Sequence, residues 1–370
     1  MLVLVVIAGA AVVEVRRRGG SSSAALDRDL PKLVSFVERT RGLRFVTRPK
    51  VQLLDDARFD QVYGGGDEAG AASGPDTGDE AYAGLLRALG LVHGDVDFNS
   101  VTEDEAQDVV GFYDSETKVL YVRGDSPVAY VEDVVVHELT HALDDQHFGI
   151  DHEPADDDGA SAYDALIEGS AMVVEDKWFD TRSRHDQDVI EAEDNGGAPT
   201  AGASDEQRGG ASDVFGALDD FPYDAGPGFV QALLDDGGQP RLDHAFADPP
   251  TTTEQVMHPD RYIHRDAARA VATPAADGPV ADEGVLGELM LKLVLGEDAG
   301  EDAAATAAAG WGGDHYVTWT DGGRTCVRAN VVMDTGHDTD ELVAALRSWA
   351  ADHPGATVTA PGPVVLTNCA

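Results

Sequence analysis

The stretch of this sequence that most constrains its fold is Val131–His147, VEDVVVHELTHALDDQH. Read as a helix at about 100° per residue, it places apolar side chains such as Val135 and Leu139 on one side. His137 and His141 fall on the other side, one helical turn apart. The pattern therefore predicts a helix that buries one face in a core and turns two imidazoles toward a cleft.

Two imidazoles at positions i and i+4, with a glutamate directly after the first, are typical of zinc hydrolases. In such a site His137 and His141 would bind the ion, and Glu138 would accept a proton from the attacking water. A hydrolytic zinc site also needs a third protein ligand and an open fourth position. The motif therefore predicts one zinc ion beside this helix.

Two residues compete for the role of third ligand. Glu168 follows His141 by 27 residues and lies in a second predicted helix over 161–180, so two antiparallel helices could share one metal. His147 instead completes HELTHALDDQH, with the spacing of the HExxHxxGxxH motif, in which a glycine turns the chain. Asp144 occupies that glycine position and adopts a left-handed conformation less readily than glycine. We expect Glu168 to be the ligand, with a His147-based zinc hydrolase as the alternative.

The remainder of the chain predicts an α+β fold. Two β-rich runs, 109–114 and 119–123, flank a short polar turn and predict a hairpin directly before the key helix. Such a strand edge could hold an extended peptide. We expect a mainly helical catalytic region over 24–300 and a small α+β unit over 310–370. The polar, acidic segment 181–212 is expected to be a disordered insertion.

The charge of the chain excludes one class of partner. The sequence contains 69 acidic and 26 basic residues, which give a net charge of −43 and a pI near 4.3. Such a surface repels phosphate backbones, so we expect no nucleic acid partner. The acidic loop 151–159 could bind calcium, but Pro154 and Ala165 occupy positions where an EF-hand needs carboxylates. Calcium therefore has no support beyond composition.

The N-terminus and the cysteines indicate export. Leu2–Val13 is an apolar run followed by arginines at 16–18, and it is shorter than the roughly 20 residues of a membrane span. We expect residues 1–23 to be a signal peptide or an N-terminal membrane anchor, and the protein to be extracellular or in the cell envelope. Cys326 and Cys369 each lie near the end of a strand-like run. An oxidising compartment favours a disulfide between them over two separate thiols.

These motifs also carry a family resemblance. HELTHALDDQHF followed by ALIEGSA resembles the gluzincin metallopeptidases, which pair an HExxH helix with a glutamate on a following helix. VVGFYDSETKVLYVRG, FPYDAGPGFVQAL and PPTTTEQVMHPDRY are similar to segments of a group of exported, mostly uncharacterised zinc metallopeptidases of bacteria and archaea. The likeness covers about 109–262. It implies a zincin-like fold, zinc at His137, His141 and Glu168, Glu138 as general base, and a peptide or protein substrate.

One position departs from the gluzincin pattern. Thermolysin-like members have an acid four residues after the ligand glutamate, where this chain has Met172. An outer carboxylate normally orients a metal-binding histidine, so another residue must do so, and Asp164 and Glu175 are the candidates.

A zinc hydrolase also needs a hydrogen-bond donor for the developing oxyanion. Tyr223 and His258 are the main candidates because their segments look tethered, and His315 is a third. The alternative from a different class is a noncatalytic envelope protein that keeps the metal site for binding and stability.

Overall fold

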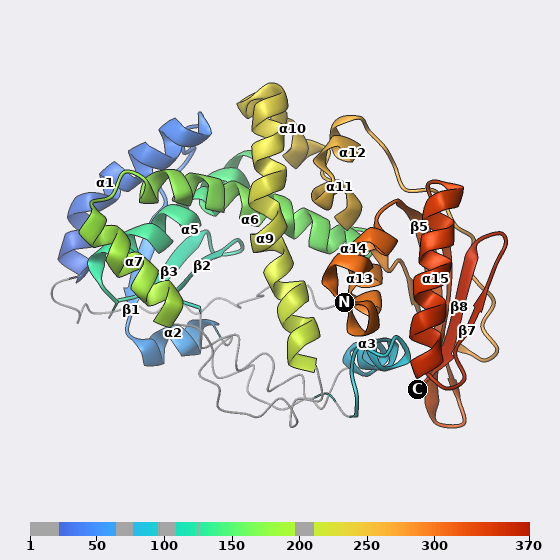
Figure 1. Cartoon of the computed structure of the whole chain (residues 1–370). Helices are drawn as coiled ribbons and strands as arrows, with labels where there is room; N and C mark the ends of the chain where they lie inside the picture. The colour runs from blue at the N-terminus through green and yellow to red at the C-terminus, as the bar shows by residue number, and fades with distance from the viewer. Residues whose placement is uncertain (1–21, 64–76, 95, 97–108, 125, 197–210) are drawn as a thin grey trace.

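The computed structural model describes residues 22–63, 77–94, 96, 109–124, 126–196 and 211–370. These residues form an α+β protein with two separate sheets. Helix α9 (Ala211–Gly237) runs through the middle of the molecule, between the N-terminal helices and the C-terminal sheet (Figure 1). Residues 1–21 of the expected signal peptide or anchor lie outside the described residues.

A three-stranded sheet precedes the HExxH helix. Its strands are β1 (Lys50–Leu54), β2 (Gly111–Asp114) and β3 (Val119–Arg123), in the order β1-β3-β2. β1 runs parallel to β3, whereas β2 and β3 form an antiparallel hairpin. The carboxylate of Asp114 closes the turn by accepting hydrogen bonds from the backbone N–H groups of Glu116 and Thr117, at 2.9 and 3.0 Å. The predicted hairpin is confirmed.

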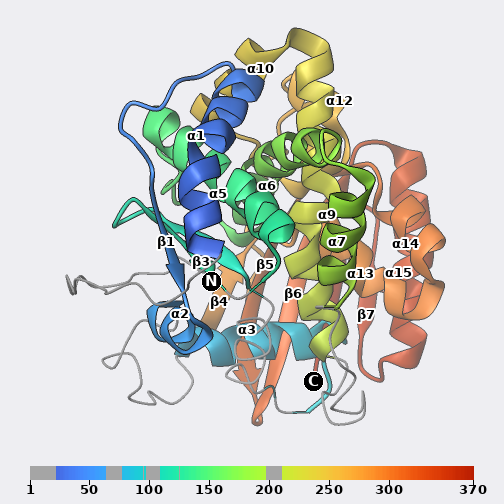
Figure 2. The same cartoon turned by 90° about the vertical axis from the view of Figure 1, so that its left-hand side faces the viewer.

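The HExxH motif lies on helix α5 (Val128–Phe148). Val135, Leu139 and Leu143 on its apolar side are fully buried against helix α1 (Ser22–Arg41) and strand β3. Figure 2 shows α1 lying across α5, with α2 (Asp56–Tyr63) beside the sheet. The predicted apolar face of the motif helix therefore forms one core of the protein.

Helix α6 (Asp157–Phe179) follows α5 and crosses α9 very closely. A Cβ atom on Gly169 would lie 2.3 Å from the carbonyl group of Gly226, and one on Gly226 would lie 2.3 Å from the carbonyl oxygen of Ala165. Because real Cβ atoms do not approach so closely, only glycine at both positions permits this crossing. The crossing holds the part of α9 that carries Tyr223 against the part of α6 that carries Glu168.

The segment 181–212 is not a disordered insertion throughout. It contains helix α7 (Arg184–Gly196), which packs on α5 and buries Ile190. Just before α7, Arg182 forms an ion pair with Glu132 of α5 at 3.1 Å. Polar composition therefore gave a wrong prediction for these residues, because a few contacts attach the segment to α5. Residues 197–210 lie outside the described residues.

Three short helices surround one end of α9. They are α10 (Gln239–Ala247), α11 (Thr253–Met257) and α12 (Pro259–Ile263). A second apolar core lies between them, α6 and α9, and its buried members include Phe229, Leu233, Leu242 and Phe246. This core packs the C-terminal half of α9, which carries Phe229 and Leu233, against α6.

The C-terminal unit is built on a five-stranded antiparallel sheet. Its strands are β4 (Val280–Gly284), β5 (Trp311–Asp321), β6 (Arg324–Met333), β7 (Thr357–Thr359) and β8 (Val364–Cys369), in the order β4-β5-β6-β8-β7. The helices of its core are α3 (Thr77–Ala88), α13 (Gly287–Ala299), α14 (Glu301–Ala308) and α15 (Gly336–Asp352). Because β4 pairs with β5, the unit begins before the expected boundary at residue 310.

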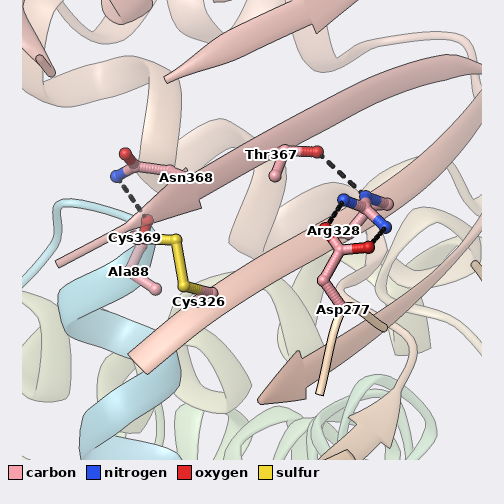
Figure 3. Close-up of a disulfide and its surroundings, with 7 residues drawn as sticks. All are labelled: Ala88, Asp277, Cys326, Arg328, Thr367, Asn368 and Cys369. Atoms are coloured by element: carbon pink, nitrogen blue, oxygen red, sulfur yellow. Dashed lines mark hydrogen bonds and ion pairs between the residues drawn. A yellow bond between two sulfur atoms is a disulfide. The ribbon is translucent and has the colours of Figure 1, made fainter. Parts of the chain in front are cut away.

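A disulfide joins β6 to β8. Cys326 and Cys369 face each other in the strand register, and their sulfur atoms are 2.01 Å apart (Figure 3). The predicted bridge is confirmed. Among the described helices, none combines the length and the apolar character that a membrane crossing requires.

Candidate metal centre

Helix α5 directs both motif histidines toward α6. The Nε2 atoms of His137 and His141 lie 3.0 Å apart, as expected for side chains one helical turn apart. Both side chains are largely buried, with exposed fractions of 14% and 11%. Two imidazole nitrogens facing each other at this distance must share either a proton or a cation.

Helix α6 brings Glu168 to the same point. Its Oε2 atom lies 3.1 Å from Nε2 of His137 and 3.5 Å from Nε2 of His141. Among the described residues, these three form the one group of three or more metal-ligating side chains whose donor atoms converge. The predicted set of His137, His141 and Glu168 is therefore brought together by the fold.

The spacing of the three atoms fits a tetrahedral metal site. Ligand atoms about 2.1 Å from a zinc ion, at the corners of a tetrahedron, lie about 3.4 Å from one another. The observed separations of 3.0, 3.1 and 3.5 Å are close to this value. Two imidazoles and one carboxylate are also a ligand set that zinc accepts in catalytic sites.

The electrostatics of the cluster hold its carboxylate ionised. Burial opposes ionisation of Glu168, but His141 and His137 outweigh it and lower its pKa well below the usual range. Burial likewise opposes protonation of His137, yet Glu175 and Glu168 raise its pKa well above the usual value. The ionised Glu168 and the two histidines therefore form a site that favours a positive charge, either a proton or a metal ion.

Glu138 lies beside the cluster rather than in it. Its side chain is buried, and burial raises its pKa, while His141 and His137 act in the opposite direction. A Cβ atom on Gly111 of β2 would lie 3.6 Å from Cγ of Glu138 and 2.6 Å from a methyl group of Val134. The backbone of the edge strand β2 therefore runs directly past the predicted general base.

An outer carboxylate orients His137. Glu175, two turns after Glu168 on α6, lies 2.7 Å from Nδ1 of His137 through its Oε2 atom. A proton on Nδ1 leaves the lone pair of Nε2 free for a metal ion. Of the two candidates, Glu175 holds this position. Asp164 lies one turn before Glu168, and desolvation together with Glu168 raises the pKa of Asp164 to about 7.

Tyr223 is the one predicted oxyanion donor that lies near the cluster. It extends from α9 with about half of its surface exposed. The negative charge of Glu168, then burial, then Glu138 raise the pKa of its hydroxyl group, which therefore stays protonated and able to donate. A protonated hydroxyl group under the electrostatic influence of Glu168 and Glu138, on a half-exposed side chain, is suited to contact a substrate.

The other two candidate donors lie elsewhere. Nε2 of His258, at the start of α12, is 2.9 Å from Oε1 of the buried Glu288 on α13. His315 lies on β5 in the C-terminal sheet, opposite Asn330 of β6. The structure therefore uses His258 to join α12 to α13, and neither histidine is part of the cluster.

His147 lies apart from the histidine pair. Helix α5 continues through Asp144 to Phe148, so the turn that would bring His147 back to the histidine pair does not form. His147 is exposed, and its Nε2 atom lies 2.8 Å from the backbone oxygen of Arg44. It fastens the chain after α1 to the end of α5.

Two aspartates of the acidic segment 151–159 accept hydrogen bonds that stabilise the fold. Asp156 caps α6 by accepting a hydrogen bond from the N–H group of Gly159 at 2.9 Å. Asp158 is buried and accepts hydrogen bonds from the hydroxyl and N–H groups of Thr253. Within the described part of the chain, the converging group of metal-ligating residues includes no member of this loop. The structure adds no support for calcium there.

Sequence reasoning missed one carboxylate behind the cluster. Asp133 is buried one turn before His137, and it forms a hydrogen bond with Glu175. Burial, followed by the charge of Glu175, raises the pKa of Asp133 to about 9, so this environment favours the protonated form of Asp133. Its position four residues before the first motif histidine was the available signal.

Comparison with known proteins bears on the C-terminal unit alone. Residues 276–368 match a family described as a domain of unknown function, DUF8575. The matched region begins just before β4 and ends within β8, so it covers nearly all of the five-stranded sheet, with Cys326 but without Cys369, and excludes the candidate metal cluster. No curated protein and no solved structure matches the chain.

Proposed function

We propose that this protein is a zinc-dependent metallopeptidase of the gluzincin type. The observation that carries the proposal is the convergence of His137, His141 and Glu168 at spacings that suit a tetrahedral zinc site, with Glu138 beside them. The ligands come from two successive helices, as the HExxH…E pattern requires. A peptide or protein is the substrate class that this arrangement suits.

Each residue of the site has a distinct role in hydrolysis. A bound zinc ion would polarise the scissile carbonyl group and lower the pKa of a water molecule at its open position to about 7. Glu138 accepts the proton of the attacking water and passes it to the leaving amine. Tyr223 donates a hydrogen bond to the carbonyl oxygen as negative charge develops there. With the ion bound, Glu175 would accept a hydrogen bond from Nδ1–H of His137 and leave Nε2 to the metal.

Strand β2 is a suitable binding surface for the substrate backbone. It is an edge strand of its sheet, and a peptide can extend such an edge by backbone hydrogen bonds. Because Gly111 lies against Glu138, a peptide paired with β2 would pass the general base. An extended, unfolded stretch of protein is therefore the preferred form of substrate.

The site of action that suits this enzyme is outside the cytoplasm. A disulfide between Cys326 and Cys369 forms in oxidising compartments, and the apolar run Leu2–Val13 supports export. We therefore assign the protein to the extracellular space or the cell envelope, released by cleavage or held there by its N-terminus.

The test compares zinc-loaded wild-type protein with Glu138→Gln in hydrolysis of an unfolded protein. Loss of the general base should lower kcat by about 10²- to 10⁴-fold at equal zinc content. Glu153→Gln, a change of the same kind at an exposed position of the 151–159 loop, serves as the control and should leave kcat unchanged.

Two other outcomes select the alternatives. If wild type and Glu138→Gln both bind one zinc ion and neither hydrolyses the substrate, the result would favour a noncatalytic metal-binding envelope protein. Measurable hydrolysis that is the same in both proteins would exclude Glu138 as the base.

A further inference from the structure

A buried ion pair lies directly behind the metal cluster. Asp144 accepts hydrogen bonds through Oδ1 from Nε and Nη2 of Arg41, at 2.9 and 2.7 Å. Its other oxygen, Oδ2, accepts a hydrogen bond from the hydroxyl group of Ser170 at 2.6 Å. The side chains of Arg41 and Asp144 are 1% and 3% exposed, and Ser170 is also fully buried.

The three residues come from three helices that meet at the site. Asp144 lies on α5 three residues after His141, and Ser170 lies on α6 two residues after Glu168. Arg41 is the last residue of α1 and is itself held by Gln239 and Asp243 of α10. One carboxylate therefore connects both metal-binding helices within one turn of a ligand on each.

Stability alone is a poor explanation for this arrangement. Removing two charges from water costs several kcal/mol per ion, and well-packed apolar residues in place of a buried ion pair are often as stable or more stable. What a hydrogen-bonded pair adds is direction, because each bond fixes the angle and register of the groups that it joins. Here the register is that of α5 against α6, on which the separations of the three ligand atoms depend.

We propose that Asp144, anchored by Arg41, is a positioning residue that locks α6 to α5 through Ser170 and so sets the distance of Glu168 from the two histidines. This inference rests on the metal centre of the proposed function. It also explains why position 144 carries an aspartate within an unbroken helix: the residue accepts hydrogen bonds from both neighbouring helices.

The first experiment measures zinc affinity of the full chain by competition with a chromophoric chelator. Ser170→Ala removes the donor on α6 and should raise the Kd for zinc about tenfold, the lower end of what loss of an outer contact causes. Ser161→Ala is the matched control, because its hydroxyl bonds within α6 to the backbone oxygen of Asp157. It should bind zinc as wild type does.

The absorption spectrum of the cobalt-substituted protein gives an independent reading. A changed distance of Glu168 from the histidines alters the geometry around the ion, so the visible bands of Ser170→Ala should shift, and those of Ser161→Ala should not. A purely structural role would lower the melting temperature of the metal-free protein without changing either the Kd or the spectrum of the folded fraction.

A triple variant separates positioning from folding if Ser170→Ala unfolds. Arg41→Met, Asp144→Leu and Ser170→Ala together replace the network by apolar side chains, a change that leaves no buried charge unpaired. The protein should stay folded and bind zinc at least tenfold more weakly. Wild-type zinc affinity in a folded triple variant, or in Ser170→Ala, would overturn the inference. Failure of the wild-type protein itself to bind zinc would instead overturn the proposed function.

Discussion

Helix α5 buries many more titratable side chains than the C-terminal sheet does. Besides its apolar face, α5 buries six titratable side chains, namely Glu132, Asp133, Glu138, His141, Asp144 and Asp145. The core of the C-terminal unit is apolar, built from residues such as Trp311, Val327, Leu342 and Trp349. Burying charge weakens a fold unless each group is paired, so α5 carries a larger cost than the sheet, which buries the carboxylate of Asp314.

The difference separates the proposed metal site from the unit that the disulfide stabilises. On α5, partners from α1, α6 and the β2–β3 hairpin hold the charged groups, and the predicted ligands lie among them. In the C-terminal unit, a disulfide and apolar packing do the stabilising. Changes in the first region should therefore act on metal binding, and changes in the second should act on unfolding.

The largest effect on metal binding should come from Glu168→Ala. Loss of one of three ligands should weaken zinc binding by more than the roughly 100-fold that loss of an outer contact causes. His147→Ala should leave the Kd for zinc unchanged, because His147 contacts the backbone of Arg44. Zinc retained in Glu168→Ala and lost in His147→Ala would favour the alternative ligand set.

The C-terminal unit should respond in the opposite way to loss of its disulfide. Cys326→Ser with Cys369→Ser opens a loop with a sequence separation of 43 residues, which should lower the free energy of unfolding by about 2–4 kcal/mol. The Kd for zinc should stay at the wild-type value. Urea unfolding without reductant, paired with zinc titration, checks both statements, and a parallel loss of zinc would show that the two regions are not separable.

The buried carboxylate of Asp314 gives the C-terminal unit a defined pH dependence. Asp314 accepts hydrogen bonds from the N–H groups of Leu286 and Gly287 and from the indole of Trp311. Burial raises its pKa from 3.8 to about 6, although these donors act in the opposite direction. The fold therefore favours the protonated form, so the contribution of Asp314 is greatest below about pH 4 and falls as the pH rises to 6.

Asp314→Asn removes this titration. The difference in unfolding free energy between wild type and Asp314→Asn should fall by up to about 3 kcal/mol between pH 4 and pH 6 and then stay constant. Urea unfolding of both proteins at several pH values measures it. A difference that rises over this range would mean that the N–H donors outweigh burial.

The sequence predicted the candidate metal ligands and the disulfide better than the long-range contacts between helices. HELTH, Glu168 and the cysteine pair could each be assigned a role from a short pattern or spacing, and the structure brings each set together. The turn-rich segment around His258 predicts a site residue, but the structure places its imidazole against Glu288. That contact joins residues 30 positions apart, and no local pattern reports it.

Two further features depend on contacts that spacing does not encode. Arg41 and Asp144 are 103 residues apart, and an arginine at a helix end carries no sign of its partner. The crossing of α6 and α9 depends on Gly169 meeting Gly226, each of which reads locally as an ordinary small residue. The proposed metal ligands are thus visible in the sequence, whereas the residues that join their helices become visible only after folding.

The smallest effect on zinc binding should come from substitution of Glu175. This change tests whether residues beyond the three ligands contribute to zinc affinity. Glu175→Gln keeps an oxygen within reach of Nδ1 of His137 but loses the charge that supports the imidazole, so the Kd for zinc should rise about 10- to 100-fold. Asp176→Asn, a neutralisation at the next, exposed position of α6, is the control and should change nothing. If both variants bound zinc equally well, only the three ligands would contribute to zinc affinity. Asp133 and Glu175 would then have a structural role between α5 and α6.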